Sequence, residues 1–309
     1  MTDSVAGATA DQAYLWCPAY PLPNALAVAE ARAAAEIFTT ALHLTLRGSP
    51  LLDRHPGPGA WLSAAERITD LPTDCAWLLA ARGGYGCLDL LDTWAAWSTA
   101  NPTARVIGYS DLTILHAAQA VLGAPGGLYG FMPGVRHGLR ARSSAIALAR
   151  GEALTVSDLA GAHVLHAGNA EGPLFAGCLR VLTGLCGTPW MPKLAGCILA
   201  LEDLDERPYR IDRDLQQLHA SGALTGIQGL VFGTFPSELP AAYAGPSTSD
   251  ICRAWAARLN VPAVFGVPFG HDADPLTLGI GRLTRLLAGT CEPDSWALTQ
   301  TSTLCTLPR

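Results

Sequence analysis

Two short apolar runs, each ending in a glycine-containing turn, constrain the fold of this 309-residue chain more than any other feature. Residues 76–81 end in Arg82-Gly83-Gly84-Tyr85-Gly86, and residues 104–107 end in Gly108-Tyr109-Ser110. Each turn leads into a segment whose apolar residues have helical spacing. Strand–helix alternation with short connections predicts a parallel sheet with helices on both faces. Because the carboxyl ends of parallel strands open at one edge of the sheet, we expect the two turns to lie together there.

The same alternation extends over the first part of the chain. Ser63, with Glu66 three positions later, forms a capping box that predicts the start of a short helix. Strands are expected over 13–17, 43–47, 76–81 and 104–107, and helices over 26–42, 63–71, 88–97 and 111–121.

The second half of the chain has more short strand patterns. Strands are expected over 163–167, 196–201, 226–232 and 264–267, and helices over 174–185, 213–221 and 249–259. This predicts an α/β protein with an N-terminal parallel-sheet domain over 1–138, a linker over 139–160 and a mixed or β-rich domain over 161–309.

Composition and charge exclude several classes of protein. Half of the residues are hydrophobic and only 15% are charged, which is enough apolar material for buried cores. The net charge is −6 with no basic run, so nucleic-acid binding is not expected. Neither a signal peptide nor a stretch of ~18 apolar residues is found, so no membrane association is expected. The nine irregularly spaced cysteines include no C-x-x-C pair, which predicts buried free thiols in a reducing, cytoplasmic setting and no metal site.

Ser110 stands at the expected turn from a strand into a helix. There its hydroxyl projects from the sheet edge, and N–H groups at the positive end of the helix can hold an oxyanion. The hydrolase pattern Gly-x-Ser-x-Gly is only half matched, since Leu112 occupies the last position. The alternative interpretation is that Ser110 caps the helix.

The glycine loop 82–86 allows a ligand to approach the backbone closely. A phosphate-binding loop is one alternative, although the segment lacks both the G-x-G-x-x-G and the G-K-[ST] patterns. A purely structural turn is the other.

Two further strand ends carry ionisable residues. Leu199-Ala200-Leu201 runs into Glu202, and Val267-Pro268-Phe269-Gly270 runs into His271. A serine, an acid and a histidine at strand ends are the parts of a catalytic triad, in which the carboxylate orients the base. Glu206 is a rival for the acid, and Glu202 is preferred because it directly ends its strand. Surface or buried structural roles are the alternative for both.

Several motifs occur in a fixed order along residues 75–280. They are 82–86, Gly108-Tyr109-Ser110-Asp111, Leu201-Glu202-Asp203, Pro208-Tyr209-Arg210-Ile211-Asp212-Arg213 and Gly266-Val267-Pro268-Phe269-Gly270-His271. Together they resemble the LD-carboxypeptidase family of serine peptidases, which includes murein tetrapeptide carboxypeptidases and microcin C self-immunity proteins.

The resemblance implies an N-terminal flavodoxin-like or Rossmann-like domain, a C-terminal β-rich domain resembling a swivelling β-barrel, and a homodimer. It places the nucleophile on Ser110, the acid on Glu202 and the base on His271, without a metal or organic cofactor. The backbone N–H groups of Asp111 and Gly84 would form the oxyanion hole. Substrate contacts are expected from the loop and from the segment before the second domain, namely Arg82, Gly83, Tyr85 and His137.

The reaction implied by the resemblance is hydrolysis of the L,D-peptide bond before the terminal D-alanine of a murein tetrapeptide, in cell-wall recycling. One alternative is a microcin C-type immunity hydrolase that cleaves peptidyl or aminoacyl sulfamoyl-adenylates. Another is a non-catalytic binding protein that keeps the cleft.

Overall fold

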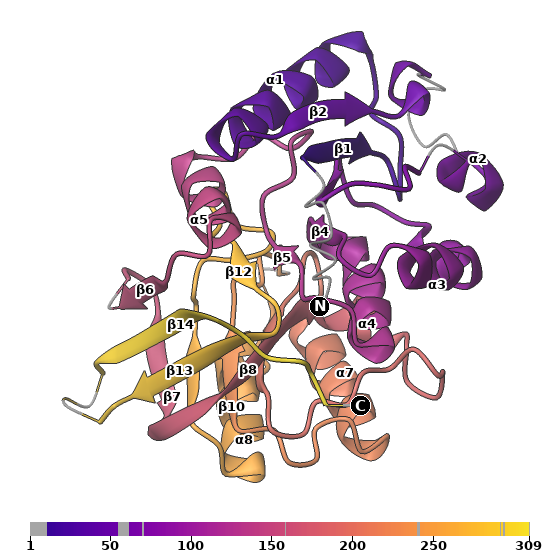
Figure 1. Ribbon diagram of the computed structural model, residues 1–309. Helices are drawn as coiled ribbons and strands as arrows, with labels where there is room; N and C mark the ends of the chain where they lie inside the picture. The colour runs from indigo at the N-terminus through magenta and orange to yellow at the C-terminus, as the bar shows by residue number, and fades with distance from the viewer. Residues whose placement is uncertain are drawn as a thin grey trace, which may run out of the picture.

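The computed structural model describes residues 11–54, 62–69, 71–157, 159–239, 242–290, 292 and 294–308. Its strands form two sheets, and Figure 1 shows α1 and β2 at one end of the molecule and β13, β14, α7 and α8 at the other. None of the helices in these ranges is both long and apolar enough to cross a bilayer. The eight described cysteines are all free, and six of them are buried, as expected.

The first sheet has the strand order β12-β5-β4-β3-β1-β2, in which all neighbouring strands are parallel except β12, which is antiparallel to β5. Its strands are β1 (Gln12–Trp16), β2 (Thr45–Gly48), β3 (Trp77–Ala80), β4 (Arg105–Ile107), β5 (Leu128–Tyr129) and β12 (Leu278–Gly279). Its helices are α1 (Ala25–Ala41), α2 (Ala64–Ile68), α3 (Leu91–Ala100) and α4 (Thr113–Leu122), with short 3-10 turns at Pro50–Asp53, Cys87–Leu90 and Ser110–Leu112. The expected capping box at Ser63 opens α2.

Both faces of this sheet are buried, because successive strand residues point to opposite sides. Ala13 and Leu15 of β1 join one apolar cluster with residues of α1 and α5. Tyr14 and Trp16 join the other cluster with residues of α3 and α4. The prediction of a sheet between two helical layers is therefore confirmed, and five of its six strands are parallel as expected, while β12 makes the sheet mixed.

The second sheet has the order β6-β14-β13-β8-β9-β10-β11-β7. Its strands are β6 (Leu154–Ser157), β7 (His163–His166), β8 (Gly168–Cys178), β9 (Ile198–Glu202), β10 (Gly229–Phe232), β11 (Ala263–Phe265), β13 (Arg282–Ala288) and β14 (Trp296–Leu304). The remaining helices are α5 (Leu139–Ala149), α6 (Leu179–Thr183), α7 (Pro208–Ala220) and α8 (Thr248–Leu259). Strands β8 to β11 are parallel and the outer pairings are antiparallel, so the second half is mixed α/β. Barrel-like closure stays a prediction.

The structure corrects the helix expected over 174–185. Residues up to Cys178 belong to β8, and only Leu179–Thr183 is helical. Leu174, Phe175 and Ala176 are buried on both faces of the sheet, so their run lacks the alternation that identifies a strand. The stretch 139–160, expected as a linker, contains helix α5 and strand β6, and β6 pairs with β14 of the second sheet. The division at residue 138 stays a prediction.

The chain returns from the second sheet to the first near its end. After β11, β12 pairs with β5, and Thr277 accepts the N–H of Phe131 at 3.0 Å and donates to the carbonyl of Ala141 at 2.8 Å. The buried cluster that contains α3 and α4 also contains β9 and α7, so the two sheets share one core. This return brings the segment with His271 beside the carboxyl edge of the first sheet.

Candidate active site

Ser110 lies in a strained turn between β4 and α4. Its φ is +65°, a left-handed conformation that disfavours residues with a side chain by about 1–2 kcal/mol. Hydrogen bonds to two side chains help to hold this backbone: Thr113 Oγ1 donates to the Ser110 carbonyl at 2.7 Å, and the Ser110 N–H donates to Tyr129 Oη at 3.3 Å. The turn therefore resembles a nucleophile elbow although Leu112 replaces the second glycine of the pattern.

The glycine loop lies directly beside this elbow, as the sequence predicts. A Cβ added at Gly83 would stand 3.0 Å from Ser110 Cβ, so a larger residue would displace the serine. Asp111 is buried, and its Oδ2 accepts the N–H of Cys87 at 2.7 Å, which joins the end of the loop to the elbow. The buried Arg67 donates to the Gly86 carbonyl at 2.8 Å from the other side.

Glu202 and His271 form a hydrogen-bonded pair at the end of β9. Glu202 is fully buried, and its Oε2 accepts from His271 Nδ1 at 2.7 Å and from the His271 backbone N–H at 3.1 Å. A carboxylate can only accept, so the proton of this contact is on Nδ1, and Nε2 is left for another partner. A Cβ at Gly270, whose φ is +76°, would stand 2.1 Å from the Glu202 carboxyl carbon, so only glycine fits there.

The charges around His271 favour its protonated form. Burial by itself lowers the pKa of the imidazole, but the hydrogen bond to Glu202 and the charges of Glu202, Asp203 and Asp205 outweigh it, so the pKa is raised. Asp203 is also buried, and burial raises its pKa to about 6 despite hydrogen bonds from the N–H groups of Arg180 and Leu204. The carboxyl groups that act on His271 thus lie at and just after the end of β9.

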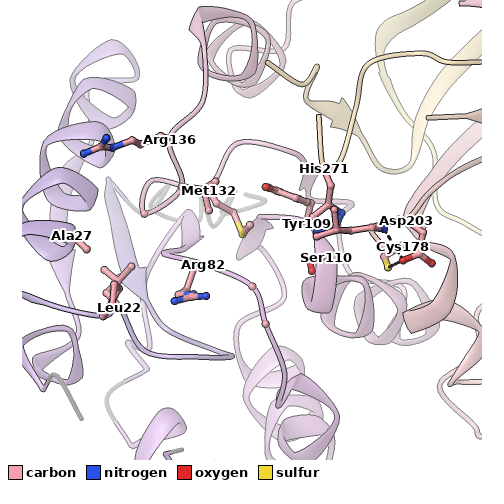
Figure 2. Close-up of a pocket in the computed structure, with 16 residues that line it drawn as sticks. Leu22, Ala27, Arg82, Tyr109, Ser110, Met132, Arg136, Cys178, Asp203 and His271 are labelled. Atoms are coloured by element: carbon pink, nitrogen blue, oxygen red, sulfur yellow. Dashed lines mark hydrogen bonds between the residues drawn. The ribbon is translucent and has the colours of Figure 1, made fainter. Parts of the chain in front are cut away.

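Ser110 and His271 line one cavity of about 630 Å³. Figure 2 shows Tyr109, Cys178 and Asp203 grouped with them on one side, and Arg82, Leu22, Ala27 and Arg136 on the other. The Tyr109 ring stands edge-on to the His271 ring, with 5.0 Å between centroids. Among the described residues, the Ser110 hydroxyl has no hydrogen-bond partner.

Not every residue expected at the site lines this cavity. Arg82, Gly83 and Gly84 do, whereas Tyr85 is exposed and does not line it, and His137 lines a neighbouring cavity of about 390 Å³. Burial lowers the pKa of His137 to about 4, and neither ring nitrogen has a hydrogen-bond partner among the described residues. Glu206, the rival acid, forms a 3.4 Å ion pair with Arg210 instead of contacting His271.

Sequence reasoning missed Tyr129. Its hydroxyl donates to Glu202 Oε1 at 2.6 Å and accepts the Ser110 N–H, so it connects both halves of the site. The residue lies in the glycine- and proline-rich stretch 123–138, which has no clear period. The available signal was topological: Tyr129 ends a strand next to β4 and so opens on the same sheet edge as Ser110. Within the described ranges, no group of three His, Cys, Asp or Glu side chains is arranged to hold a metal ion.

Comparison with known proteins finds two matching family models and a group of similar sequences and structures. Residues 18–130 match the family model described as the LD-carboxypeptidase N-terminal domain, and residues 171–286 match that of the C-terminal domain. The murein tetrapeptide carboxypeptidase of Pseudomonas aeruginosa is 32% identical over 237 residues, which is 71% of this chain and 74% of that protein.

Solved structures have the same fold. The crystal structure of muramoyltetrapeptide carboxypeptidase from Oxalobacter formigenes superposes with a TM-score of 0.78 and 25% identity, covering 96% of this chain and 100% of that one. An MccF-like protein of Bacillus anthracis also superposes with a TM-score of 0.78, at 20% identity, covering 96% of this chain and 98% of that one.

Proposed function

Because this chain belongs to the LD-carboxypeptidase family, we propose that Ser110, His271 and Glu202 are the nucleophile, the base and the base-orienting acid of a serine carboxypeptidase. The observation that carries the proposal is the 2.7 Å contact between His271 Nδ1 and the buried Glu202, in the cavity that Ser110 also lines. This contact fixes the imidazole with Nε2 available to take the serine proton.

The reaction proposed is hydrolysis of the L,D-peptide bond before the terminal D-alanine of a murein tetrapeptide. Ser110 Oγ attacks the carbonyl carbon while His271 takes its proton. The amine of D-alanine leaves with that proton, and a water molecule then hydrolyses the acyl-enzyme with His271 again as base. The murein peptide is proposed because the Pseudomonas aeruginosa relative and the Oxalobacter formigenes structure carry that activity in their names.

The proposed oxyanion hole consists of the N–H groups of Asp111 and Gly84. Asp111 directly follows the nucleophile, and Gly84 lines the cavity with a φ of +124°, which a residue with a side chain rarely adopts. Backbone donors of this kind typically stabilise the transition state by about 3–4 kcal/mol each.

The wall opposite Ser110 is the proposed binding region for substrate carboxylates. Arg82 lines this wall, where its guanidinium lies over the Tyr20 ring and donates to the Pro21 carbonyl at 3.4 Å. The carboxylate of the leaving D-alanine, or of the peptide that remains, is the class of group that a guanidinium binds. We also propose a homodimer, for which light scattering of the purified protein would give twice the chain mass of 32.3 kDa.

Mass spectrometry of products tests the proposed reaction. Wild-type protein and Ser110→Ala are incubated with murein tetrapeptide, with a DD-pentapeptide and with an aminoacyl sulfamoyl-adenosine. We expect loss of one D-alanine from the tetrapeptide with the wild type only, and a fall in kcat of about 10⁴–10⁶-fold in the variant. Turnover of the sulfamoyl-adenosine without release of D-alanine would favour the immunity reaction, and equal activity of the variant would exclude Ser110 as nucleophile.

A further inference from the structure

We propose that Tyr129 is a positioning residue, whose hydroxyl holds the Ser110 backbone and the Glu202 carboxylate together across the two sheets. The proposal rests on the proposed function, because it assigns Tyr129 a role in the reaction of Ser110 and His271. It adds a fourth side chain to the three already named.

The hydroxyl of Tyr129 occupies a position between the two halves of the site. It donates to Glu202 Oε1 at 2.6 Å and accepts the Ser110 N–H at 3.3 Å. Tyr129 ends β5 in the first sheet, and Glu202 ends β9 in the second. The contact therefore links two strand ends 73 residues apart in sequence, one beside the nucleophile and one at the base.

The ring of Tyr129 has little freedom to leave this position. It is fully buried, and its centroid lies 6.2 Å from that of Tyr109, 6.0 Å from His116 and 6.4 Å from Phe269. His116 is itself fixed by a 2.9 Å contact between Nε2 and the Gly108 carbonyl. Packing on several sides holds the hydroxyl in one place, as the orientation of a catalytic group requires.

The hydroxyl keeps its proton throughout the working pH range. Burial, followed by the charge of Glu202, raises the pKa of Tyr129 well above its ordinary value. It is thus a permanent donor to Glu202, and its lone pair remains available to the Ser110 N–H. A buried carboxylate needs such donors, because it has lost its hydration.

The donated hydrogen bond changes the proton affinity of the His271 imidazole. It draws on the negative charge of Glu202, so the carboxylate attracts a protonated imidazole less strongly and uptake of a proton by His271 is opposed. The other titratable groups that act on the pair or on Tyr129 are Asp203, Asp205, Cys178, Tyr109 and His137, and His116 contacts the Tyr129 ring. None of these donates a hydrogen bond to Glu202 among the described residues, so the effect of Tyr129 is separable from theirs.

The test compares Tyr129→Phe with the wild type on murein tetrapeptide. The variant keeps the ring and loses only the hydroxyl. We expect kcat to fall about tenfold to a hundredfold with KM changed less than about twofold, because reacting groups are misplaced while the binding wall is intact. The acid limb of kcat/KM is expected to move up by about half to one pH unit, since His271 then takes up a proton more readily.

A matched control is Tyr14→Phe, which removes a buried tyrosine hydroxyl from β1, three strands away from β5 in the same sheet. It is expected to keep the wild-type pH profile. Titration of active sites with a fluorophosphonate corrects kcat for any misfolded fraction. A double-mutant cycle with Glu202→Gln adds a further readout, because loss of the hydroxyl should have little additional effect once the charge it serves is gone.

Replacing the tyrosines of the wild-type chain with 3-fluorotyrosine keeps ring and hydroxyl, so folding is not at risk. The fluorinated phenol is a stronger acid and a stronger donor, so the acid limb should move down, opposite to the Tyr129→Phe shift. A pH profile unchanged by both substitutions would overturn the role of Tyr129 while leaving the reaction intact. Full activity of Ser110→Ala would instead overturn the proposed function itself.

Discussion

The nucleophile half and the acid–base half of the site are built in different ways. Ser110 is positioned by its own backbone: a left-handed φ of +65°, a glycine loop in contact with it, and a helix that begins at once. Glu202 and His271 are positioned by each other, through a side-chain contact between residues 69 positions apart. One half is therefore local in sequence, and the other exists only after the chain has folded back from the second sheet.

Because of this difference, we expect the two halves to respond differently to amino-acid substitutions. A local turn is set by a few neighbouring residues and tolerates changes elsewhere in the molecule. A buried hydrogen-bonded pair depends on the geometry of both partners, and removing His271 leaves the buried Glu202 carboxylate with fewer hydrogen-bond donors. We therefore expect substitutions in the acid–base half to act mainly on the pH profile and on kcat. Substitutions at Ser110 in the elbow should all abolish activity but differ in their effect on the free energy of unfolding.

The largest effect that tests the acid–base half is expected for Glu202→Gln. The amide keeps the size of the side chain but can no longer hold the imidazole in the required tautomer, so kcat should fall about 10³–10⁴-fold. Glu206→Gln is the matched control, since Glu206 pairs with Arg210 and is expected to leave kcat within about twofold. If the two variants had equal effects in steady-state kinetics, the assignment of the acid to Glu202 would be wrong.

The pH dependence of the wild type is the next largest effect. His271 must be neutral to accept the serine proton, and its raised pKa means that it stays protonated to a higher pH than an ordinary histidine. Activity is therefore lost as the pH falls through this raised pKa, and the acid limb of kcat/KM should have its midpoint above about 6.5, with a tenfold loss per unit below it. A midpoint well below that value would show that the surrounding carboxylates do not control the base.

A smaller effect is expected on the opposite wall of the cavity, which belongs to neither half of the catalytic pair. Arg82→Leu removes the guanidinium proposed to bind a substrate carboxylate and should raise KM about tenfold with little change in kcat. Amidation of the terminal carboxylate shows whether Arg82 binds the carboxylate of the leaving D-alanine or that of the peptide that remains. If the Arg82 guanidinium binds the terminal carboxylate, amidation removes that contact, and the variant and the wild type should hydrolyse the amidated peptide equally well.

The same contrast explains how much the sequence alone predicts. The strands before Gly83 and Gly108 and the helix after Ser110 follow from local apolar patterns and glycine turns, so the parallel sheet and the elbow are predictable. The hydrogen bond from Tyr129 to Glu202 and the pairing of β12 with β5 join residues far apart in the sequence. Such tertiary contacts leave no periodic pattern in the sequence. The strand character of 174–178 was missed for a related reason, because this end of β8 is buried between neighbouring strands and shows no alternation.

The smallest expected effect tests whether the backbone of Ser110 is strained, as proposed for the nucleophile half. Because its left-handed conformation disfavours a Cβ, Ser110→Gly should be more stable than Ser110→Ala by about 1 kcal/mol in the free energy of unfolding, measured by urea denaturation. Both variants lack the nucleophile and should be equally inactive, so activity and stability are separated at one position. Ser98, buried within α3, supplies the control, because Ser98→Gly should be less stable than Ser98→Ala by about 1 kcal/mol. Equal stability of the two Ser110 variants would mean that the elbow stores no backbone strain, and the nucleophile would then be held by its hydrogen bonds alone.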